Sequence, residues 1–249
     1  MPVALLALFN NLFFGFGEVF HNNVWWSRAF AMRKGVPLKA FILSGLLWFP
    51  IPIAAGFIGL CAGPLGINVA DPDMVGPLVA SQVLGGVGSI LVFIVLFCSL
   101  ASSIDSLLAA TADLVTEDIY RKVFRPEASD EAVRRASTWV IVGLGVLTWV
   151  ICLPNRGNLI TVLYSSGPLV ASAIWPIVAG LYFPQTSRVG AAAAMLLGSV
   201  LGLVAYFTLG WFTASLISAA VSMVTVFVTT ALRPDSFDWK TLNEHPDPA

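Results

Sequence analysis

Residues 97–122 read FCSLASSIDSLLAATADLVTEDIYRK, and they continue a long apolar run that begins near residue 87. An apolar run of this length predicts that the stretch forms the cytoplasmic half of a membrane helix. Its hydroxyl groups recur at helical spacing, which places them on one stripe of the helix. The stripe consists of Ser99, Ser102, Ser103 and Ser106, and the carboxylate of Asp105 lies beside it. Because oxygen atoms that face lipid are costly, we expect the stripe to face a cavity, an ion or other helices.

The composition indicates a polytopic membrane protein. The 249-residue chain is 57% hydrophobic and only 11% charged, whereas soluble domains carry about 25% charged residues. Its net charge of −1 gives no electrostatic reason to expect nucleic-acid binding. The cysteines and histidines lack the spacing of a disulfide framework or a zinc site. No Walker A, nucleophile-elbow, HExxH or CxxC pattern is present, so we expect no enzymatic activity.

Apolar segments long enough to cross a hydrocarbon core about 30 Å thick recur along the chain. The seven segments cover approximately residues 3–26, 38–62, 86–114, 136–153, 158–183, 189–209 and 211–232. The last two meet at Gly210, so the turn between them must be tight. The segment 63–85 is rich in turn-forming residues, and its residues 77–84 are able to form a short surface helix. The sequence thus predicts an all-α membrane protein with about seven transmembrane helices.

Basic residues are concentrated in alternate connections between these spans. Segments 27–39 and 115–135 hold most of them, and Arg188 and the tail hold three more, so that only Arg156 lies in the other connections. Because cytoplasmic loops carry an excess of Lys and Arg, we expect the N-terminus outside and the C-terminus in the cytoplasm. The predicted location is the plasma (inner) membrane.

Two linked motifs in the opening stretch resemble the sodium:solute symporter family. Residues 101–108, ASSIDSLL, are similar to the run MSTADSxLL in the eighth core helix of that family, and residues 116–120, TEDIY, are similar to the TxDIY that follows it. Residues 17–29, GEVFHNNVWWSRA, look like the GTVFxDQxYWQRA of its urea/polyamine branch, at the end of the sixth core helix. The departures from this last run bear on which solute would be transported more than on which family the chain resembles.

The resemblance implies the second inverted repeat of a LeuT-like fold, followed by two accessory helices. Core helices six to ten would occupy about residues 1–183 and the accessory helices about 189–232. Together they would form a transmembrane transporter domain of residues 1–232, with a cytoplasmic tail of residues 233–249. In such folds, solute and ion bind near the midplane between the two repeats. The first repeat is not part of this match, and a separate chain is one source that could supply it.

The resemblance also implies that the serine stripe belongs to a sodium site. The hydroxyls of Ser102 and Ser103 and the carbonyl of Ser99 would bind the ion, since hard cations favour oxygen ligands. Ser106 lies on the same stripe, and Asp105 would tune the ion site, accept a proton or bond to a neighbouring helix. The alternative is that these hydroxyls donate to the preceding turn or across a helix interface.

Substrate contacts in such transporters come from interrupted helices. In the first span, the best candidates for a break are residues 10–11 and 15–17, since glycine permits unwinding. A break there would place Phe14, Phe16, Glu18, Asn22 and Trp26 near the solute pathway. In the fifth span, residues 164–168, YSSGP, form a second polar break that adds Tyr164 and Ser165. For each aromatic residue the alternative is ordinary packing.

A cytoplasmic gate would use Asp118 pairing with Arg121 or Arg28, and a plain solvated surface is the alternative.

Taken together, these features predict sodium-coupled symport of a small polar solute, with urea or a related amine or amide favoured. Sodium would be the coupling ion rather than a prosthetic group, and the partners would be membrane lipid and the solute. The alternatives are another solute, such as a carboxylate or an amino acid, and an inactive or structural membrane fragment.

Overall fold

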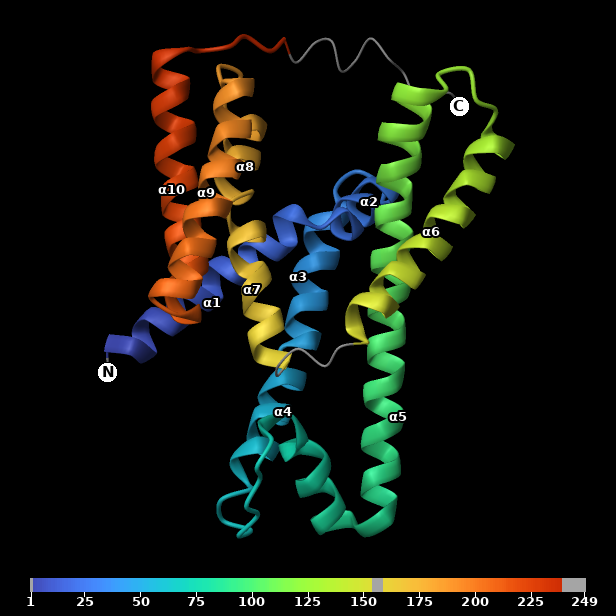
Figure 1. Ribbon diagram of the computed structural model, residues 1–249, viewed down its shortest axis with the longest axis vertical. Coiled ribbons are helices and arrows are strands. Elements are labelled where there is room, and N and C mark those ends of the chain that lie inside the picture. The colour runs from blue at the N-terminus through green and yellow to red at the C-terminus, as the bar shows by residue number, and fades with distance from the viewer. Residues whose placement is uncertain (1, 154–158, 239–249) are drawn as a thin grey trace. The chain divides into compact units, whose positions relative to one another are not determined.

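The computed structural model describes residues 2–153 and 159–238. Within these ranges every regular element is a helix, and Figure 1 shows their order along the chain. Seven helical segments are long and apolar enough to cross a membrane: Pro2–His21, Val36–Leu60, Pro72–Phe124, Asp130–Cys152, Thr161–Tyr182, Arg188–Thr208 and Trp211–Leu232. The predictions of an all-α membrane protein and of seven spans are therefore confirmed.

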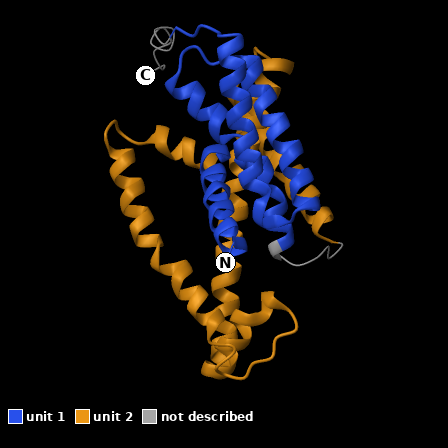
Figure 2. Cartoon of the chain, turned by 90° about the vertical axis from the view of Figure 1, so that its left-hand side faces the viewer, with its two compact units in different colours: residues 1–22, 157–249 blue, residues 23–156 orange. Residues whose placement is uncertain are grey.

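The chain divides into two compact units, which Figure 2 shows in different colours. Unit 1 contains residues 1–22 and 157–249, and unit 2 contains residues 23–156. Unit 1 therefore joins the first helix to the C-terminal part of the chain. The division into core helices, accessory helices and tail that the resemblance implies follows different boundaries and remains a prediction.

The described part of unit 1 contains α1 (Pro2–His21), α7 (Leu159–Ala171), α8 (Ile174–Tyr182), α9 (Arg188–Thr208) and α10 (Trp211–Leu232). Helices α9 and α10 lie side by side, and α10 also packs against α1, α7 and α8 (Figure 1). Gly210 joins α9 to α10 with a φ of 111°, a conformation that glycine adopts without steric cost. The tight turn expected there is present.

Small residues allow the helices of unit 1 to approach closely. Helix α9 buries Gly190, Ala194, Gly198, Gly202 and Ala205, mostly four residues apart. A Cβ atom at Gly202 would lie 2.7 Å from the Cβ atoms of both Pro168 in α7 and Ser218 in α10. Real side chains do not tolerate such contacts, so the close packing of α7, α9 and α10 depends on this glycine.

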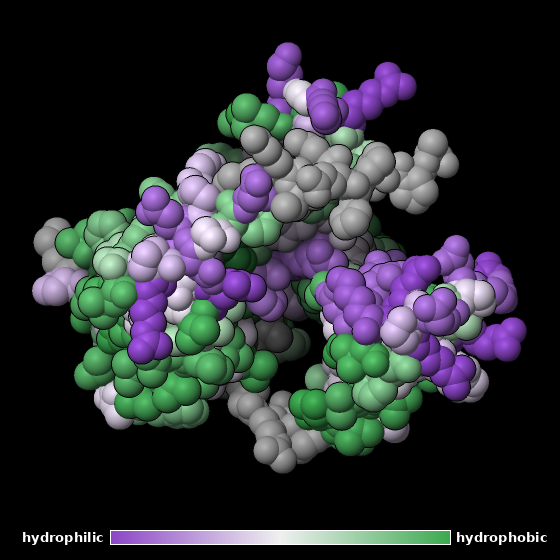
Figure 3. Space-filling model, turned by 90° about the horizontal axis from the view of Figure 1, so that it is seen from above, coloured by the Kyte–Doolittle hydropathy of each residue, from purple (hydrophilic) through white to green (hydrophobic). Residues whose placement is uncertain are grey.

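The described part of unit 2 contains α2 (Asn23–Ala31), α3 (Val36–Trp48), α4 (Pro50–Leu60), η1 (Pro72–Met74), α5 (Val75–Leu114), η2 (Val115–Phe124) and α6 (Asp130–Cys152). Helix α5 bends at Gly85, whose φ of 63° separates a short helix from the membrane span. The short helix expected over residues 77–84 is thus present. Hydrophilic residues gather over the connection between η2 and α6, and hydrophobic residues cover the flanks of the helices (Figure 3).

The predicted break inside the first span is wrong. Helix α1 runs without interruption through residues 10–17, and the chain leaves the helix only at Asn22. Gly17 serves close packing instead of unwinding, because a Cβ atom there would lie 2.7 Å from the backbone nitrogen of Ala171 and from the carbonyl oxygen of Val170. A glycine in contact with the backbone of a neighbouring helix has a packing role in an intact helix.

The break in the fifth span lies further along the chain than predicted. Residues 164–168 are helical in α7, and the interruption falls at Ser172 and Ala173. Pro176 in the first turn of α8 accounts for this position. Proline has no N–H group and would clash with the carbonyl four residues earlier, whereas it is tolerated in the first turn of a new helix.

Candidate functional site

The predicted ion-binding residues lie on an accessible face of α5 in unit 2. Ser99, Ser102, Ser103 and Asp105 are exposed within the unit, and Ser106 is half-buried. The hydroxyl of Ser103 donates to the carbonyl oxygen of Ser99 at 2.9 Å. The Ser103 hydroxyl oxygen keeps its own lone pairs for a cation, whereas the Ser99 carbonyl already accepts the helical N–H of Ser103 as well as this hydroxyl.

The chemistry of this stripe suits a monovalent hard cation. Its donors are hydroxyl and carbonyl oxygens with one carboxylate nearby, which resembles the oxygen-only sets that hard cations prefer. In the residues that the structure describes, no three His, Cys, Asp or Glu side chains form a group able to hold a metal ion. The oxygen donors of the stripe therefore fit a hard cation better than a transition metal.

The second half of the opening motif forms η2, a π-helix at the end of α5. Thr116 is buried there, and its hydroxyl donates to the carbonyl oxygen of Ala112 at 2.8 Å. π-Helical segments are often found at functional sites, and this ten-residue one begins nine residues after Ser106. The motif thus anchors the end of α5 through a buried hydroxyl.

Of the predicted gate residues, Arg28 and Asp118 are exposed and Arg121 is half-buried, and each contacts a side chain other than the predicted partner. Asp118 pairs with Lys122 at 2.6 Å, and Arg121 pairs with Asp130 at 3.1 Å. Arg28 lies over the ring of Trp25, 5.5 Å from the centroid. The arrangement supports a solvated surface with local ion pairs, and the gate remains a prediction.

The structure brings together two of the predicted pathway residues in unit 1. The ring centroids of Phe14 in α1 and Tyr164 in α7 lie 5.7 Å apart. Trp211 at the start of α10, which sequence reasoning missed, lies 4.6 Å from Tyr164. The three helices therefore contribute one aromatic cluster. Ser165, in the same turn of α7 as Tyr164, donates to the carbonyl oxygen of Val162 at 2.7 Å.

Of the remaining predicted pathway residues, three lie in unit 1 and one lies in unit 2. Phe16 is 50% exposed, and Glu18 is exposed on the same helix. Asn22 lies at the end of α1, where its N–H donates to the carbonyl oxygen of Glu18 at 3.1 Å. Trp26 belongs to unit 2 and stacks on Phe30.

A buried polar contact beside the aromatic cluster links α1 to α10. Asn10 is fully buried, and its Oδ1 accepts the N–H groups of Ser215 at 2.8 Å and Leu216 at 3.3 Å. Among the described residues, Asn10 Nδ2 and Ser215 Oγ are buried without a hydrogen-bond partner. The sequence signal for this contact is a polar residue, Asn10, inside an apolar run. It does not identify the partner, which lies near the other end of the chain.

These features define a class of protein: an integral membrane protein of packed helices, with an oxygen-lined helix stripe of the kind that lines ion and solute pathways. The sodium:solute symporter family matches residues 2–198. The chain belongs to this family, whose members couple solute movement to a cation and are transporters rather than enzymes.

Similar proteins include several urea transporters. The urea-proton symporter DUR3 of Oryza sativa subsp. japonica is 30% identical over 94% of this chain and 36% of that protein. The urea active transporter of Saccharomyces cerevisiae is 24% identical over 96% and 37%, and the osmoregulated proline transporter OpuE of Bacillus subtilis is 27% identical over 69% and 36%. The chain spans about a third of the length of these relatives. No solved structure matches it.

Proposed function

We propose that this chain forms part of a sodium-coupled symporter for a small polar solute, with urea or a related amine or amide as the substrate. The observation that carries the proposal is the family match over residues 2–198, which includes the serine stripe and the motif after it. Relatives named as urea transporters align with nearly the whole chain and support urea as the solute.

The serine stripe supports sodium as the coupling ion. In this proposal the hydroxyls of Ser102 and Ser103 and the carbonyl of Ser99 bind the ion, and Ser106 extends the oxygen-lined face. The rice relative is named a urea-proton symporter, which favours a proton as the second candidate. Asp105 is the group on this stripe that would accept that proton.

The solute pathway is proposed to pass the aromatic cluster of unit 1. Urea is a flat diamide, so its recognition needs an apolar slot with hydrogen-bonding groups at the edges. Phe14 and Tyr164 would supply the slot, and Ser165 a polar edge. The remaining candidates for the pathway are Phe16, Glu18, Asn22 and Trp26.

Because the relatives are about three times as long as this chain, the site is proposed to need the segment that corresponds to their remaining length. This segment would lie on the same polypeptide or on a separate chain that supplies the first repeat.

The proposed orientation in the plasma membrane places the N-terminus outside and the C-terminus inside, with Arg28, Asp118 and Arg121 at the cytoplasmic surface. An inactive membrane fragment is the competing outcome.

The test is uptake of labelled urea into cells that lack urea transport and that produce this chain together with the remaining segment. At constant pH, replacing sodium by choline should abolish concentrative uptake. Ser102→Ala and Ser103→Ala should each raise the sodium concentration needed for half-maximal uptake by about tenfold, which corresponds to roughly 1.4 kcal/mol of lost ion binding. Uptake that follows the pH gradient and ignores sodium would replace sodium by the proton.

Thr111→Ala is the matched control, because Thr111 is an exposed hydroxyl of the same helix that donates to the carbonyl of Leu107 at 2.7 Å. It removes the same kind of contact away from the serine stripe, so sodium activation should not change.

The similarity to a proline transporter favours an amino acid as the second candidate solute. Uptake of proline in place of urea in the same cells would support that alternative.

A further inference from the structure

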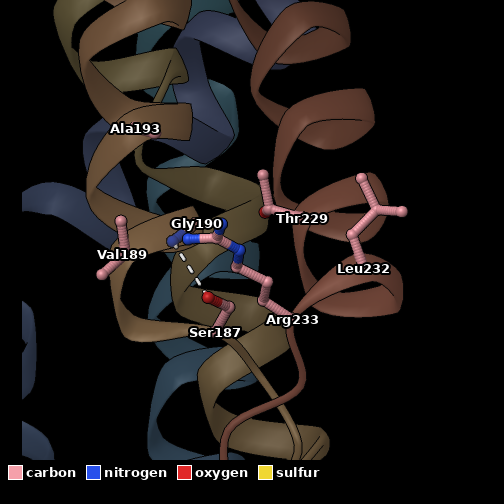
Figure 4. A pocket seen from close by; sticks show the side chains of 7 residues that line it. All are labelled: Ser187, Val189, Gly190, Ala193, Thr229, Leu232 and Arg233. Carbon is pink, nitrogen blue, oxygen red and sulfur yellow. Dashed lines mark hydrogen bonds between the residues drawn. The ribbon is translucent and has the colours of Figure 1, made fainter.

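A pocket of about 270 Å³ lies between the start of α9 and the end of α10 in unit 1. Figure 4 shows the residues that line it, which come from both helices. Val189, Ala193 and Leu232 form an apolar wall, and Ser187 and Arg233 form a polar rim. The pocket therefore combines an apolar surface with a cationic edge.

The position of this pocket places it at a membrane surface. Arg188 begins one membrane span and Leu232 ends another, so the pocket opens where two spans leave the hydrocarbon. Val189 and Leu232 are 79% and 76% exposed, and in a membrane their exposed sides face acyl chains. Residues at this depth contact lipid headgroups on one side and lipid tails on the other.

The charges at this end of unit 1 leave one arginine available. Arg188 donates through Nε to Asp235 at 2.7 Å, and this hydrogen bond lowers the pKa of the Asp235 carboxyl below its usual range. Within the described residues, Arg233 has no acidic partner, and its side chain extends from the end of α10 towards the first turn of α9 (Figure 4). The pocket therefore has a positive charge at its rim that no acidic side chain of the described residues neutralises.

Ser187 adds a second polar group to the rim. Its Oγ accepts the N–H of Gly190 at 3.2 Å, which leaves the hydroxyl hydrogen to donate to a ligand oxygen. A guanidinium and a hydroxyl above an apolar wall are complementary to a phosphate group that carries an acyl chain.

We propose that this pocket binds an anionic glycerophospholipid. The lipid phosphate contacts the guanidinium of Arg233 and the hydroxyl of Ser187, and one acyl chain runs along Val189, Ala193 and Leu232. A lipid bound here ties the end of α10 to the start of α9.

The test is native mass spectrometry of the purified full chain in detergent, with phosphatidylglycerol and phosphatidylcholine added at equal concentrations. The chain should retain phosphatidylglycerol in preference to phosphatidylcholine. Arg233→Gln should reduce retention of phosphatidylglycerol about fivefold, the factor that corresponds to roughly 1 kcal/mol for one cation at an anionic lipid surface. Arg125→Gln is the matched control, since Arg125 is also exposed and without an acidic partner among the described residues.

A second variant tests the apolar wall. Ala193→Leu narrows the pocket without changing charge and should also reduce retention of phosphatidylglycerol; if this variant does not fold, Leu232→Ser replaces it, because that side chain is mostly exposed. Equal effects of Arg233→Gln and Arg125→Gln would show attraction to surface charge in general and overturn the proposal. Equal retention of both lipids, or displacement of the lipid by inorganic phosphate, would overturn it as well.

Discussion

Gly202 offers the sharpest test of helix packing in unit 1. A Cβ atom at this position would lie 2.7 Å from the Cβ atoms of Pro168 and Ser218 and 3.1 Å from the carbonyl oxygen of Ala214. Two of these contacts come from α10 and one comes from α7, so a larger side chain cannot be accommodated by moving a single flexible group. Gly202→Val therefore forces the helices apart.

The magnitude follows from two opposing contributions. Overpacking a tight interface costs about 1–3 kcal/mol. Valine is a better helix former than glycine by about 0.3 kcal/mol, so propensity offsets little of this cost. We expect Gly202→Val to lower the free energy of unfolding by about 1–3 kcal/mol. Gly180→Val in α8 is the control, because a Cβ atom at Gly180 meets nothing within 4 Å.

The assay is reversible unfolding of the purified chain in mixed micelles, with increasing fractions of sodium dodecyl sulfate and helicity as the signal. Gly202→Val should shift the midpoint to a lower fraction of dodecyl sulfate, and Gly180→Val should leave it near that of the wild type. If the two variants unfold at the same midpoint, the close approach of α7, α9 and α10 is wrong.

Three further predictions concern topology, the buried asparagine and the tail. In a cysteine-free background, a cysteine at position 74 should be labelled from outside and one at position 128 from inside; the reverse pattern would invert the proposed orientation. Asn10→Ala removes the acceptor of two backbone N–H groups and should cost about 0.6–1.7 kcal/mol of stability per bond in the micelle assay, whereas an unchanged midpoint would mean that the contact with α10 contributes nothing. The hydrogen bond from Arg188 is the main cause of the lowered pKa of Asp235. The ion pair therefore stabilises the tail fully above the ordinary pKa of 3.8, and this stabilisation is lost as the pH falls through the lower pKa of the folded chain. Hydrogen exchange at the tail amides should therefore accelerate in that acidic range relative to Asp235→Asn, and identical exchange of the two proteins at every pH would contradict this role.

The elements that depend on local sequence could be predicted, because their causes lie within a few residues. Apolar runs located the seven spans, and Gly210 marked the tight turn between the last two. Residues 77–84 form the expected short helix, which ends where Gly85 takes a positive φ. In each case length, hydropathy or backbone freedom decides the structure without a distant partner.

The contacts that depend on distant segments could not be predicted in the same way. The sequence predicts unwinding at Gly17, yet this residue packs against the backbone of α7, which lies far along the chain. The sequence places Asn10 in the same predicted break, yet its side chain accepts N–H groups from α10. A polar or small residue in an apolar run shows that something meets it there, but the sequence alone does not identify the partner.

The two units differ in how well they cover their own polar residues, and this difference bears on the serine stripe. The described spans of unit 1 bury between 11% and 50% of their residues, with α1 the least buried, whereas those of unit 2 bury 6% or less. Lipid can cover the exposed apolar side chains of unit 2 at no cost, but it cannot solvate Asp105 and the neighbouring hydroxyls.

An ionised aspartate at the centre of a membrane helix costs about 2.5–3.5 kcal/mol when it faces hydrocarbon. Asp105 and Ser102 are exposed within unit 2, so the groups that compensate this cost must come from outside that unit. Water, a cation or another protein segment would each supply them, and a symport pathway contains all three. In the proposed function, the exposed stripe forms one wall of such a pathway.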